Sequence, residues 1–295
     1  MKKVIILSLI FTLSIFGDYS NHIDSKIVID ELVSKHGFDE SFVIEVLKNA
    51  EKRDEMLQSV AKPAEKTKTW DEYKAIFIKA KRIRDGKKFI SKNITTLEKA
   101  EKEFGVPKEI ITAILGVETN YGSNKGGYRV IDSLTTLGFD DPRRSKFFRR
   151  ELIEFFLLTR ENNLDIFKTK GSYAGAMGYG QFISSSYRAY AIDYDGDGYA
   201  DLFDSVEDSI GSTASYLARH GWKREGKIVT RTYPNNVRKF YKPHESLTRF
   251  IPLSFNENGE DLYFIGDDNF RAIARYNISD VYAMAVYYLS EEFKK

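Results

Sequence analysis

The sharpest helical pattern in the chain covers residues 107–120. Ile111, Ile114 and Leu115 recur there at the spacing of one apolar helical face. Glu118 falls on the same face, four residues after Ile114, and lies in the last turn, where the helix dipole disfavours negative charge. Burial and the dipole would both raise the pKa of this carboxyl group, as a general acid working near neutral pH requires. A structural glutamate bonded to backbone or to an arginine fits the same pattern, so both interpretations are open from this stretch alone.

Helical spacing also dominates the N-terminal third. Residues 20–104 contain amphipathic segments, a loop expected over 62–69, and a lysine-rich helical stretch over 73–104 that is interrupted near Asp85 and Gly86. This region is polar and shows no catalytic constellation.

A different pattern occupies residues 227–265, where short β-rich runs are separated by Pro234, Asn235 and Asn258-Gly259. A last helix is expected over 281–293. The chain is therefore predicted to be mainly α, in the α+β class, with a small sheet inserted between helices. The expected segments are 1–17, 18–104 (helical α-domain), 105–225 (core), 226–268 (small β-domain) and 269–295 (C-terminal helical part).

The first 17 residues are typical of a signal peptide, with Lys2 and Lys3 followed by an apolar run over 4–17. The run is short for a membrane span, which needs about 20 residues. Cleavage near Gly17 and an uncleaved N-terminal anchor both stay open, because Ile15 is a poor residue for position −3 of a cleavage site. Either way the mature protein is expected outside the cytoplasm, in the periplasm.

Composition narrows the function classes. The 295 residues are 42% hydrophobic, with 18 tyrosines and 21 phenylalanines that offer flat surfaces for sugars or for packing. A net charge of +2 argues against a nucleic-acid binder that depends on bulk charge. Cysteine is absent, which excludes disulfides, a thiol nucleophile and lipid attachment to cysteine. The four histidines are scattered without metal-ligand spacing, so a zinc hydrolase is not expected.

Two further stretches offer groups for a ligand. The glycine-rich stretch over 171–182 lets backbone approach backbone or a ligand closely, and its Ser172 and Gln181 could read sugar hydroxyls. A tight structural turn explains the glycines equally well. Arg143 and Arg144, at a helix entrance, could hold an anionic group, although a solvated face is the commoner explanation of such a pair.

A calcium loop is predicted after residue 192. Carboxylates at positions 1, 3 and 5, glycine at position 6 and a backbone carbonyl at position 7 match an EF-hand loop. These positions are Asp193, Asp195, Asp197, Gly198 and Tyr199. Position 12 is Asp204, where the standard loop has glutamate, and Glu207 or Asp208 could close a slightly longer loop. The ion would have a structural role, since a caged cation has no reason to meet substrate.

Several motifs together resemble one known family, the lytic murein transglycosylases of the membrane-bound B type. The similarity runs over about 70–289 and is weaker over the N-terminal helices. The motifs that carry it are Gly116-Val117-Glu118-Thr119-Asn120-Tyr121-Gly122, the arginine pair, residues 171–182, the Asp193 loop and residues 275–286. The resemblance implies a lysozyme-like helical core with an N-terminal α-domain, a small β-domain and a calcium-bearing EF-hand-like loop in the core.

Residue by residue, the resemblance places Glu118 as the single catalytic acid and base. It implies a sugar cleft lined by Ser172, Gln181, Tyr216, Tyr276, Asn277 and Tyr282, with Tyr73, Arg143 and Arg144 near its glycan and peptide sides. The calcium ligands would be Asp193, Asp195, Asp197, Tyr199 and Asp208. The loop after Asp204 is one residue longer than in well-known members, so the last ligand is open among Asp204, Glu207 and Asp208.

The implied reaction is non-hydrolytic cleavage of the β-1,4 bond between N-acetylmuramic acid and N-acetylglucosamine. Ordinary glycosidases use two carboxylates, whereas one glutamate suffices if the substrate's acetamide attacks the anomeric carbon and the 6-hydroxyl then closes a 1,6-anhydro ring. A lysozyme-like muramidase and a non-catalytic, calcium-stabilised glycan-binding protein are the alternatives. Expected partners are peptidoglycan strands and cell-wall synthesis proteins, with a monomeric chain and no organic cofactor.

Overall fold

The computed structural model describes residues 18–235 and 251–295. It is mostly helical with small antiparallel sheets, so the mainly α class predicted from the sequence is confirmed. The expected signal segment, residues 1–17, lies outside the described residues, as do Arg249 and Phe250 of one expected β-rich run. Within the described residues no helix is long and apolar enough to cross a membrane.

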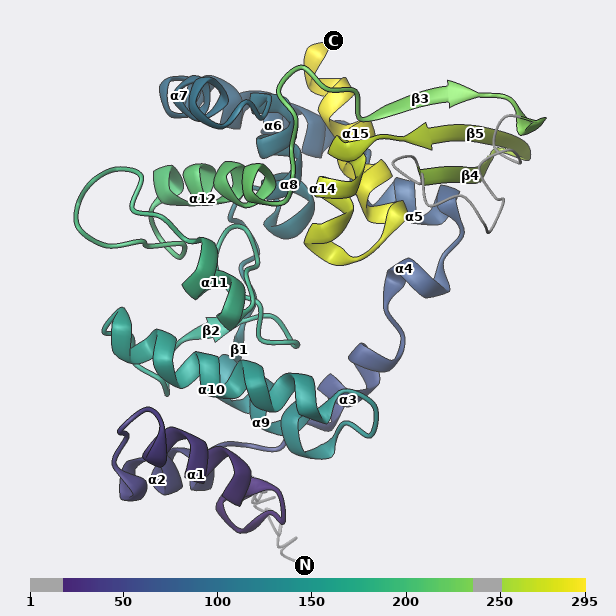
Figure 1. The fold of residues 1–295 in the computed structure, drawn as a ribbon. Coiled ribbons are helices and arrows are strands. Elements are labelled where there is room, and N and C mark those ends of the chain that lie inside the picture. The colour runs from purple at the N-terminus through teal and green to yellow at the C-terminus, as the bar shows by residue number, and fades with distance from the viewer. Residues whose placement is uncertain (1–17, 236–250) are drawn as a thin grey trace, which may run out of the picture.

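The helix that carries Glu118 lies at the centre of the upper part of the molecule (Figure 1). This helix, α8 (Lys108–Thr119), has every residue from 110 to 116 buried. Pro107 is its N-cap, and Asn120 ends it in the left-handed conformation with φ 51°. The C-terminal helix α15 (Asp280–Lys294) packs along α8. A helix enclosed in this way holds its side chains in fixed positions, which suits a site built at its last turn.

The helices form two groups (Figure 1). In the lower group α9 packs against α10 and α3, and α1 packs against α10 and α2. A two-residue antiparallel ladder, β1 with β2, pairs Tyr128 with Gly171 beside this group. The members are α1 (Ser25–Ser34), α2 (Glu40–Lys48), α3 (Asp54–Ala61), α9 (Val130–Asp140), α10 (Ser145–Glu161), β1 (Tyr128–Arg129) and β2 (Lys170–Gly171), with the short η1 (Tyr19–Asn21) beside α2.

The upper group surrounds α8. α6 and α15 pack on α8, α7 packs against α12, and α14 packs against α15. Residues 18–104 therefore contribute helices to both groups, because α1–α3 belong to the lower one. The further members are α5 (Trp70–Phe77), α6 (Ala80–Lys92), α7 (Ile94–Phe104), α12 (Val206–Arg219) and α14 (Asp268–Asn277), and α11 (Ser184–Tyr190) links α10 with α12.

The expected break near Asp85 and Gly86 is wrong, because α6 runs through both residues. A Cβ atom on Gly86 would lie 2.4 Å from the ring of Phe293 and 2.5 Å from the hydroxyl of Tyr121. The glycine therefore allows α15 and the end of α8 to approach α6 closely, and it costs the helix about 1 kcal/mol relative to alanine.

The expected loop over 62–69 contains one helical turn, α4 (Ala64–Thr67). Pro63 precedes it with φ −66°, and the Thr67 hydroxyl donates a hydrogen bond of 3.1 Å to the Pro63 carbonyl. A capping box of Thr69 and Glu72 then starts α5. Figure 1 shows α4 between the lower helices and α5, at the place where the chain passes from one group to the other.

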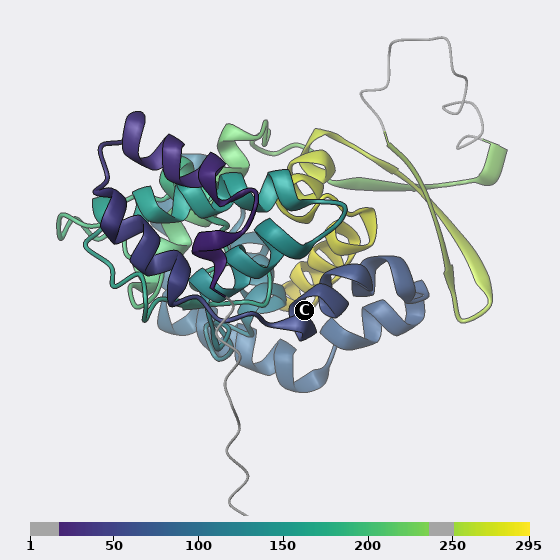
Figure 2. The same ribbon diagram turned by 90° about the horizontal axis from the view of Figure 1, so that it is seen from below.

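The small sheet has the order β3-β5-β4 and is antiparallel throughout. β4 and β5 form a hairpin whose two loop residues, Asn258 and Gly259, both have positive φ, as a tight hairpin turn requires. The sheet extends away from α14 (Figure 2), and Trp70 of α5 donates a 2.9 Å hydrogen bond to Glu257 at its edge. Its strands are β3 (Val229–Thr232), β4 (Ile251–Glu257) and β5 (Glu260–Gly266).

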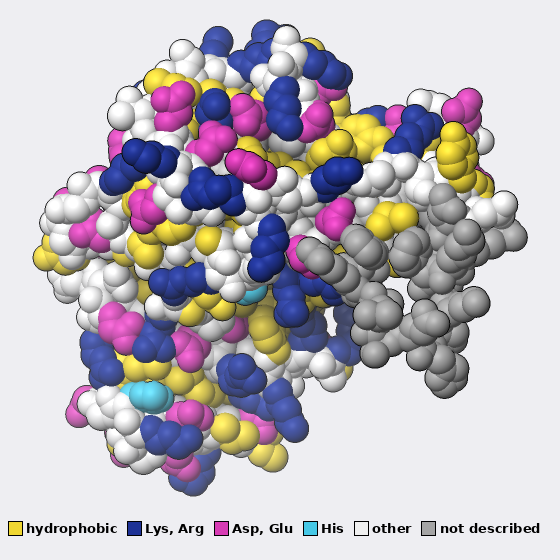
Figure 3. Space-filling model, turned by 45° about the horizontal axis from the view of Figure 1, so that its top comes forward, with side chains coloured by type: hydrophobic (Ala, Val, Ile, Leu, Met, Phe, Trp, Pro, Cys, Tyr) yellow, Lys and Arg dark blue, Asp and Glu magenta, His cyan; other side chains and the backbone are white. Residues whose placement is uncertain are grey.

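Basic and acidic side chains are mixed over the face seen in Figure 3. This agrees with the nearly balanced charge of the sequence, where 45 basic residues oppose 43 acidic ones.

Candidate active site

Glu118 lies in the last turn of α8 with its side chain only partly exposed. The hydroxyl of Tyr282, which is buried on α15, donates a 2.6 Å hydrogen bond to Glu118 Oε1. Burial raises the pKa of Glu118 to about 7, although the hydrogen bond from Tyr282 acts in the opposite direction. A carboxyl group with this pKa is protonated in about half of the molecules at neutral pH, so it can serve both as acid and as base.

A cluster of tyrosines extends from Glu118. The rings of Tyr282 and Tyr276 stack with centroids 6.3 Å apart, and the ring of Tyr216 meets Tyr276 edge-on at 4.8 Å. Tyr276 donates a 2.8 Å hydrogen bond to the Gly180 carbonyl, and Tyr216 donates one of 3.1 Å to the Arg275 carbonyl. Burial raises the pKa of Tyr276 and of Tyr282 well above 10, so both hydroxyls stay neutral donors.

The glycine-rich stretch lies against the end of α8. Thr119, next to Glu118, donates a 2.8 Å hydrogen bond to the Tyr179 carbonyl. Gln181 has φ 51° and donates through Nε2 to the carbonyls of Gly178 at 3.0 Å and Lys125 at 3.2 Å. Ser172 Oγ accepts backbone N–H groups at 3.3 and 3.0 Å, from Ala174 and Ala176. The stretch is thus a tight turn that also lies beside Glu118.

Tyr73 and Asn277 are brought together by a residue that the sequence patterns missed. Glu65 Oε1, on α4, accepts hydrogen bonds from the Tyr73 hydroxyl at 3.3 Å and from Asn277 Nδ2 at 3.0 Å. Its negative charge also raises the pKa of Glu118, after the larger effect of burial. No local signal could have found Glu65, because Asn277 is 212 residues away in the chain.

Arg143 and Arg144 lie in the turn between α9 and α10, and both side chains are exposed. Their backbone N–H groups donate to Asp141 at 2.7 and 3.1 Å. The Arg144 guanidinium lies over the ring of Phe147, 4.5 Å from its centroid. No hydrogen bond, ion pair or ring contact of residues 18–235 and 251–295 joins this pair to Glu118, and their place near the peptide side of a cleft stays a prediction.

The predicted metal loop gathers three carboxylates. Oxygen atoms of Asp193, Asp195 and Asp197 lie within 4.8 Å of one another, and all three side chains are exposed. Gly196 and Gly198 take φ +83° and +102°, which L-residues rarely adopt. Asp193 accepts N–H groups from Gly196 at 2.7 Å and from Gly198 at 2.8 Å, so the loop curls around its carboxylate. Clustered carboxylate oxygens are the donors that calcium prefers.

Asp208 is placed differently from these three. It is fully buried at the start of α12, and its two oxygens accept backbone N–H groups from Tyr194 at 2.7 Å, Asp195 at 3.2 Å and Asp201 at 2.7 Å. Asp208 therefore holds the two ends of the loop together. Asp204 lies 3.3 Å from the ammonium group of Lys125.

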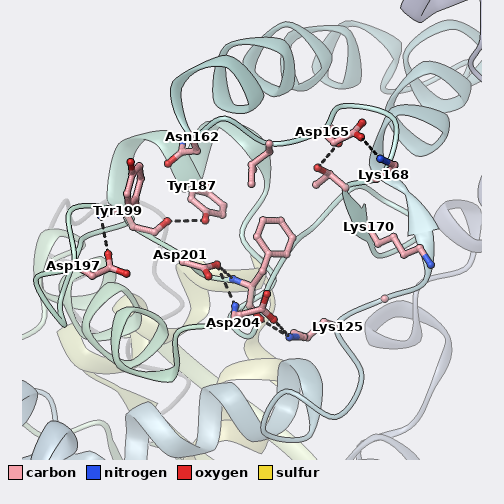
Figure 4. Close-up of a pocket in the computed structure, with 15 residues that line it drawn as sticks. Lys125, Asn162, Asp165, Lys168, Lys170, Tyr187, Asp197, Tyr199, Asp201 and Asp204 are labelled. Carbon is pink, nitrogen blue, oxygen red and sulfur yellow. Dashed lines mark hydrogen bonds and ion pairs between the residues drawn. The ribbon is translucent and has the colours of Figure 1, made fainter.

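A pocket of about 670 Å³ lies beside this loop and is partly lined by it (Figure 4). Asp197, Tyr199, Asp201 and Asp204 line one wall, and Lys125 crosses from below to the Phe203 carbonyl and Asp204. The Lys125 carbonyl also accepts from Gln181, so Lys125 contacts both the segment that follows the metal loop and the glycine-rich stretch.

The chain is similar to characterised proteins over nearly all of its length. The family "Transglycosylase SLT domain" matches residues 24–291. The membrane-bound lytic murein transglycosylase B of Escherichia coli (strain K12) is 37% identical over 303 residues, which cover 93% of this chain and 84% of that protein.

Two solved structures agree with that match. The soluble lytic transglycosylase SltB1 of Pseudomonas aeruginosa is 40% identical, with a TM-score of 0.83 over 90% of this chain and 97% of the other. The Escherichia coli lytic transglycosylase Slt35, solved in complex with calcium, is 34% identical, with a TM-score of 0.83 over 98% of each chain. The chain belongs to the Transglycosylase SLT domain family and, within it, to the lytic murein transglycosylases of the membrane-bound B type.

Proposed function

We propose that this chain is a peptidoglycan lytic transglycosylase that cleaves the β-1,4 bond between N-acetylmuramic acid and N-acetylglucosamine and leaves 1,6-anhydromuramic ends. The observation that carries the proposal is Glu118, a partly buried carboxyl group with a pKa of about 7, hydrogen-bonded to Tyr282. Membership of a family whose named members are lytic murein transglycosylases supports the reaction class.

In this mechanism Glu118 gives its proton to the glycosidic oxygen as the bond to the anomeric carbon breaks. The carbonyl oxygen of the muramic acetamide forms a bond to that carbon and closes an oxazolinium ring. Glu118, now a carboxylate, takes the proton of the 6-hydroxyl, whose oxygen then displaces the acetamide oxygen. The proton that Glu118 gives stays on the hydroxyl of the released sugar, and the proton of the 6-hydroxyl restores Glu118, so no water is consumed.

The surrounding side chains would hold the sugars and keep water out. Tyr276 and Tyr282 place neutral hydroxyls and ring faces beside Glu118, and Tyr216 extends the same surface. Ring faces suit the apolar faces of sugars, and amide groups suit their hydroxyls. We assign the remaining contacts to Tyr73, Ser172, Gln181 and Asn277, with Arg143 and Arg144 on the peptide side.

We further propose that calcium binds in the metal loop in a structural role. Asp193, Asp195 and Asp197 would supply carboxylate oxygens and Tyr199 its carbonyl, and the bound ion would fix the turn that leads to α12. The calcium complex of Slt35 supports this assignment. Asp208 remains our choice for the last ligand, and it would have to share its oxygens with the backbone N–H groups that it now accepts.

The setting of the reaction follows from the substrate. Peptidoglycan lies outside the cytoplasmic membrane, so we place the protein in the periplasm, secreted or held by an uncleaved signal segment. We expect a monomer, with cell-wall synthesis proteins as further partners.

One alternative is favoured by a specific observation. A muramidase needs a second carboxylate. Glu65 is a candidate, because it lies close enough to Glu118 for its charge to raise the pKa of Glu118. Mass spectrometry of muropeptides released from purified sacculi separates the two reactions. We expect anhydromuramic ends that are lighter than reducing ends by one water. Mainly reducing ends would establish a hydrolase instead.

A further inference from the structure

Glu65 is held in place by groups from two distant elements. Its Oε1 accepts from Tyr73 on α5 and from Asn277 at the end of α14, while Glu65 itself lies in the single turn of α4. The segment that passes between the two groups of helices is therefore tied to the C-terminal helices at this one oxygen (Figure 1).

Among the described residues, the hydrogen-bond partners of Glu65 carry no charge. In the described part of the chain its hydrogen-bond donors are a phenol and an amide, both neutral, and it takes part in no ion pair. Its field acts on Glu118 of α8, on Tyr73 of α5 and on Tyr173 in the turn after β2. A second negative charge in this place is unfavourable, so Glu65 disfavours ionisation of Glu118.

We propose that Glu65 is a positioning residue of the active site, which fixes Asn277 and Tyr73 and acts on Glu118 through its charge. This inference rests on the proposed function only for its consequence in turnover, because its effect on Glu118 is a property of the free protein. Two carboxylates then have two roles. Glu118 exchanges the proton, and Glu65 orients its neighbours.

The sharpest variant is Glu65→Gln, which keeps a carbonyl oxygen as acceptor and removes the charge. The ionisation of Glu118 is followed by the side-chain carboxyl ¹³C signal in protein with labelled glutamate, assigned by its loss in Glu118→Gln. We expect the midpoint for Glu118 to move to lower pH in Glu65→Gln. Glu55→Gln, the same change at an exposed position on α3, is the control and should leave the midpoint unchanged. An unchanged midpoint in Glu65→Gln overturns the inference whether or not the protein cleaves peptidoglycan.

Turnover on sacculi gives the second measurement. In Glu65→Gln the alkaline limb of the pH–rate profile should move to lower pH, with turnover retained on the acid side. Glu65→Ala also loses the hydrogen bonds, so we expect a higher KM together with a lower kcat, partly rescued in Glu65→Asp. A Glu65→Gln variant as inactive as Glu118→Gln at every pH, with reducing ends from the wild type, would make Glu65 a second reacting carboxylate and overturn both proposals. An inactive wild type with a shifted ¹³C midpoint would overturn the proposed function alone.

Discussion

The Glu118 site and the Asp193 loop use the same chemical group in opposite surroundings. Glu118 lies under α15 with one tyrosine hydroxyl on its carboxylate and a pKa raised to about 7. Asp193, Asp195 and Asp197 are exposed, and their oxygens converge within 4.8 Å. Burial favours the protonated form of a lone carboxyl group, whereas exposed, converging carboxylate oxygens are the ligands that calcium prefers. The environment, and not the residue type, therefore separates a proton donor from a metal ligand.

The largest effect is expected from Glu118→Gln, which preserves shape and removes the exchangeable proton. General acid and base catalysis contributes about 10²- to 10⁴-fold to the rate of a reaction. The rate of muropeptide release from sacculi should therefore fall by at least about 100-fold. Glycan binding should persist, as measured by sedimentation with sacculi. Release close to that of the wild type would remove Glu118 from the mechanism.

Calcium should affect the loop and not the proton donor. An ion that binds only the folded state stabilises it by about 2.7 kcal/mol at a concentration 100 times its Kd. Chelator should therefore lower the Tm, and Asp195→Ala should abolish the difference between chelator and calcium. Asp30→Ala, at an exposed position of α1, is the matched control and should keep the difference. Identical melting curves with and without chelator would falsify the site.

Stability against pH should reveal the buried carboxyl group. The folded pKa of Glu118 is about 7 and its usual value is 4.5, so between these pH values the unfolded chain loses the proton first. Stability is then lost as pH rises from about 4.5 and is fully lost above about 7. Glu118→Gln has no such loss and should be more stable than the wild type by about 1–3 kcal/mol at pH 8 but equal to it at pH 4. Denaturant unfolding at both pH values is the measurement, and a gain that is equal at both contradicts the assignment.

The smallest effect is expected at Tyr282, whose hydrogen bond favours the ionised form of Glu118. Tyr282→Phe should raise the pKa of Glu118 by about one unit, which corresponds to the lower end of the roughly 1.5–3 kcal/mol that a hydrogen bond to a charged group is worth. The alkaline limb of the pH–rate profile should move to higher pH, opposite to the shift in Glu65→Gln. Tyr288→Phe on the same helix should not move it. A shift of the same sign in both active-site variants would show that cavity changes, not charge, set the pKa.

Local sequence determined the elements and the reactive groups. The apolar spacing of α8 placed Glu118 on a buried face, Asn258-Gly259 marked the break between two β-rich runs, and the aspartate spacing after residue 192 predicted a calcium loop whose carboxylates converge. Each of these depends on residues within about a dozen positions, where helical period, turn conformation and loop closure act directly. The glycine at position 86 misled for the same reason, because its role is to admit Phe293, a residue 207 positions later.

The tertiary structure alone decided how Glu118 is controlled. Tyr282 is 164 residues away from it, and Glu65 meets Asn277 across 212 residues. Glu65 lies in a lysine-rich stretch whose sequence is typical of an exposed loop. The residues next to it in the sequence do not distinguish it from a solvated glutamate. A pKa depends on burial and on charges within a few ångströms, and those are set by which helix faces pack together. Sequence spacing fixes the face that each helix buries, but only the packed fold determines what that face meets.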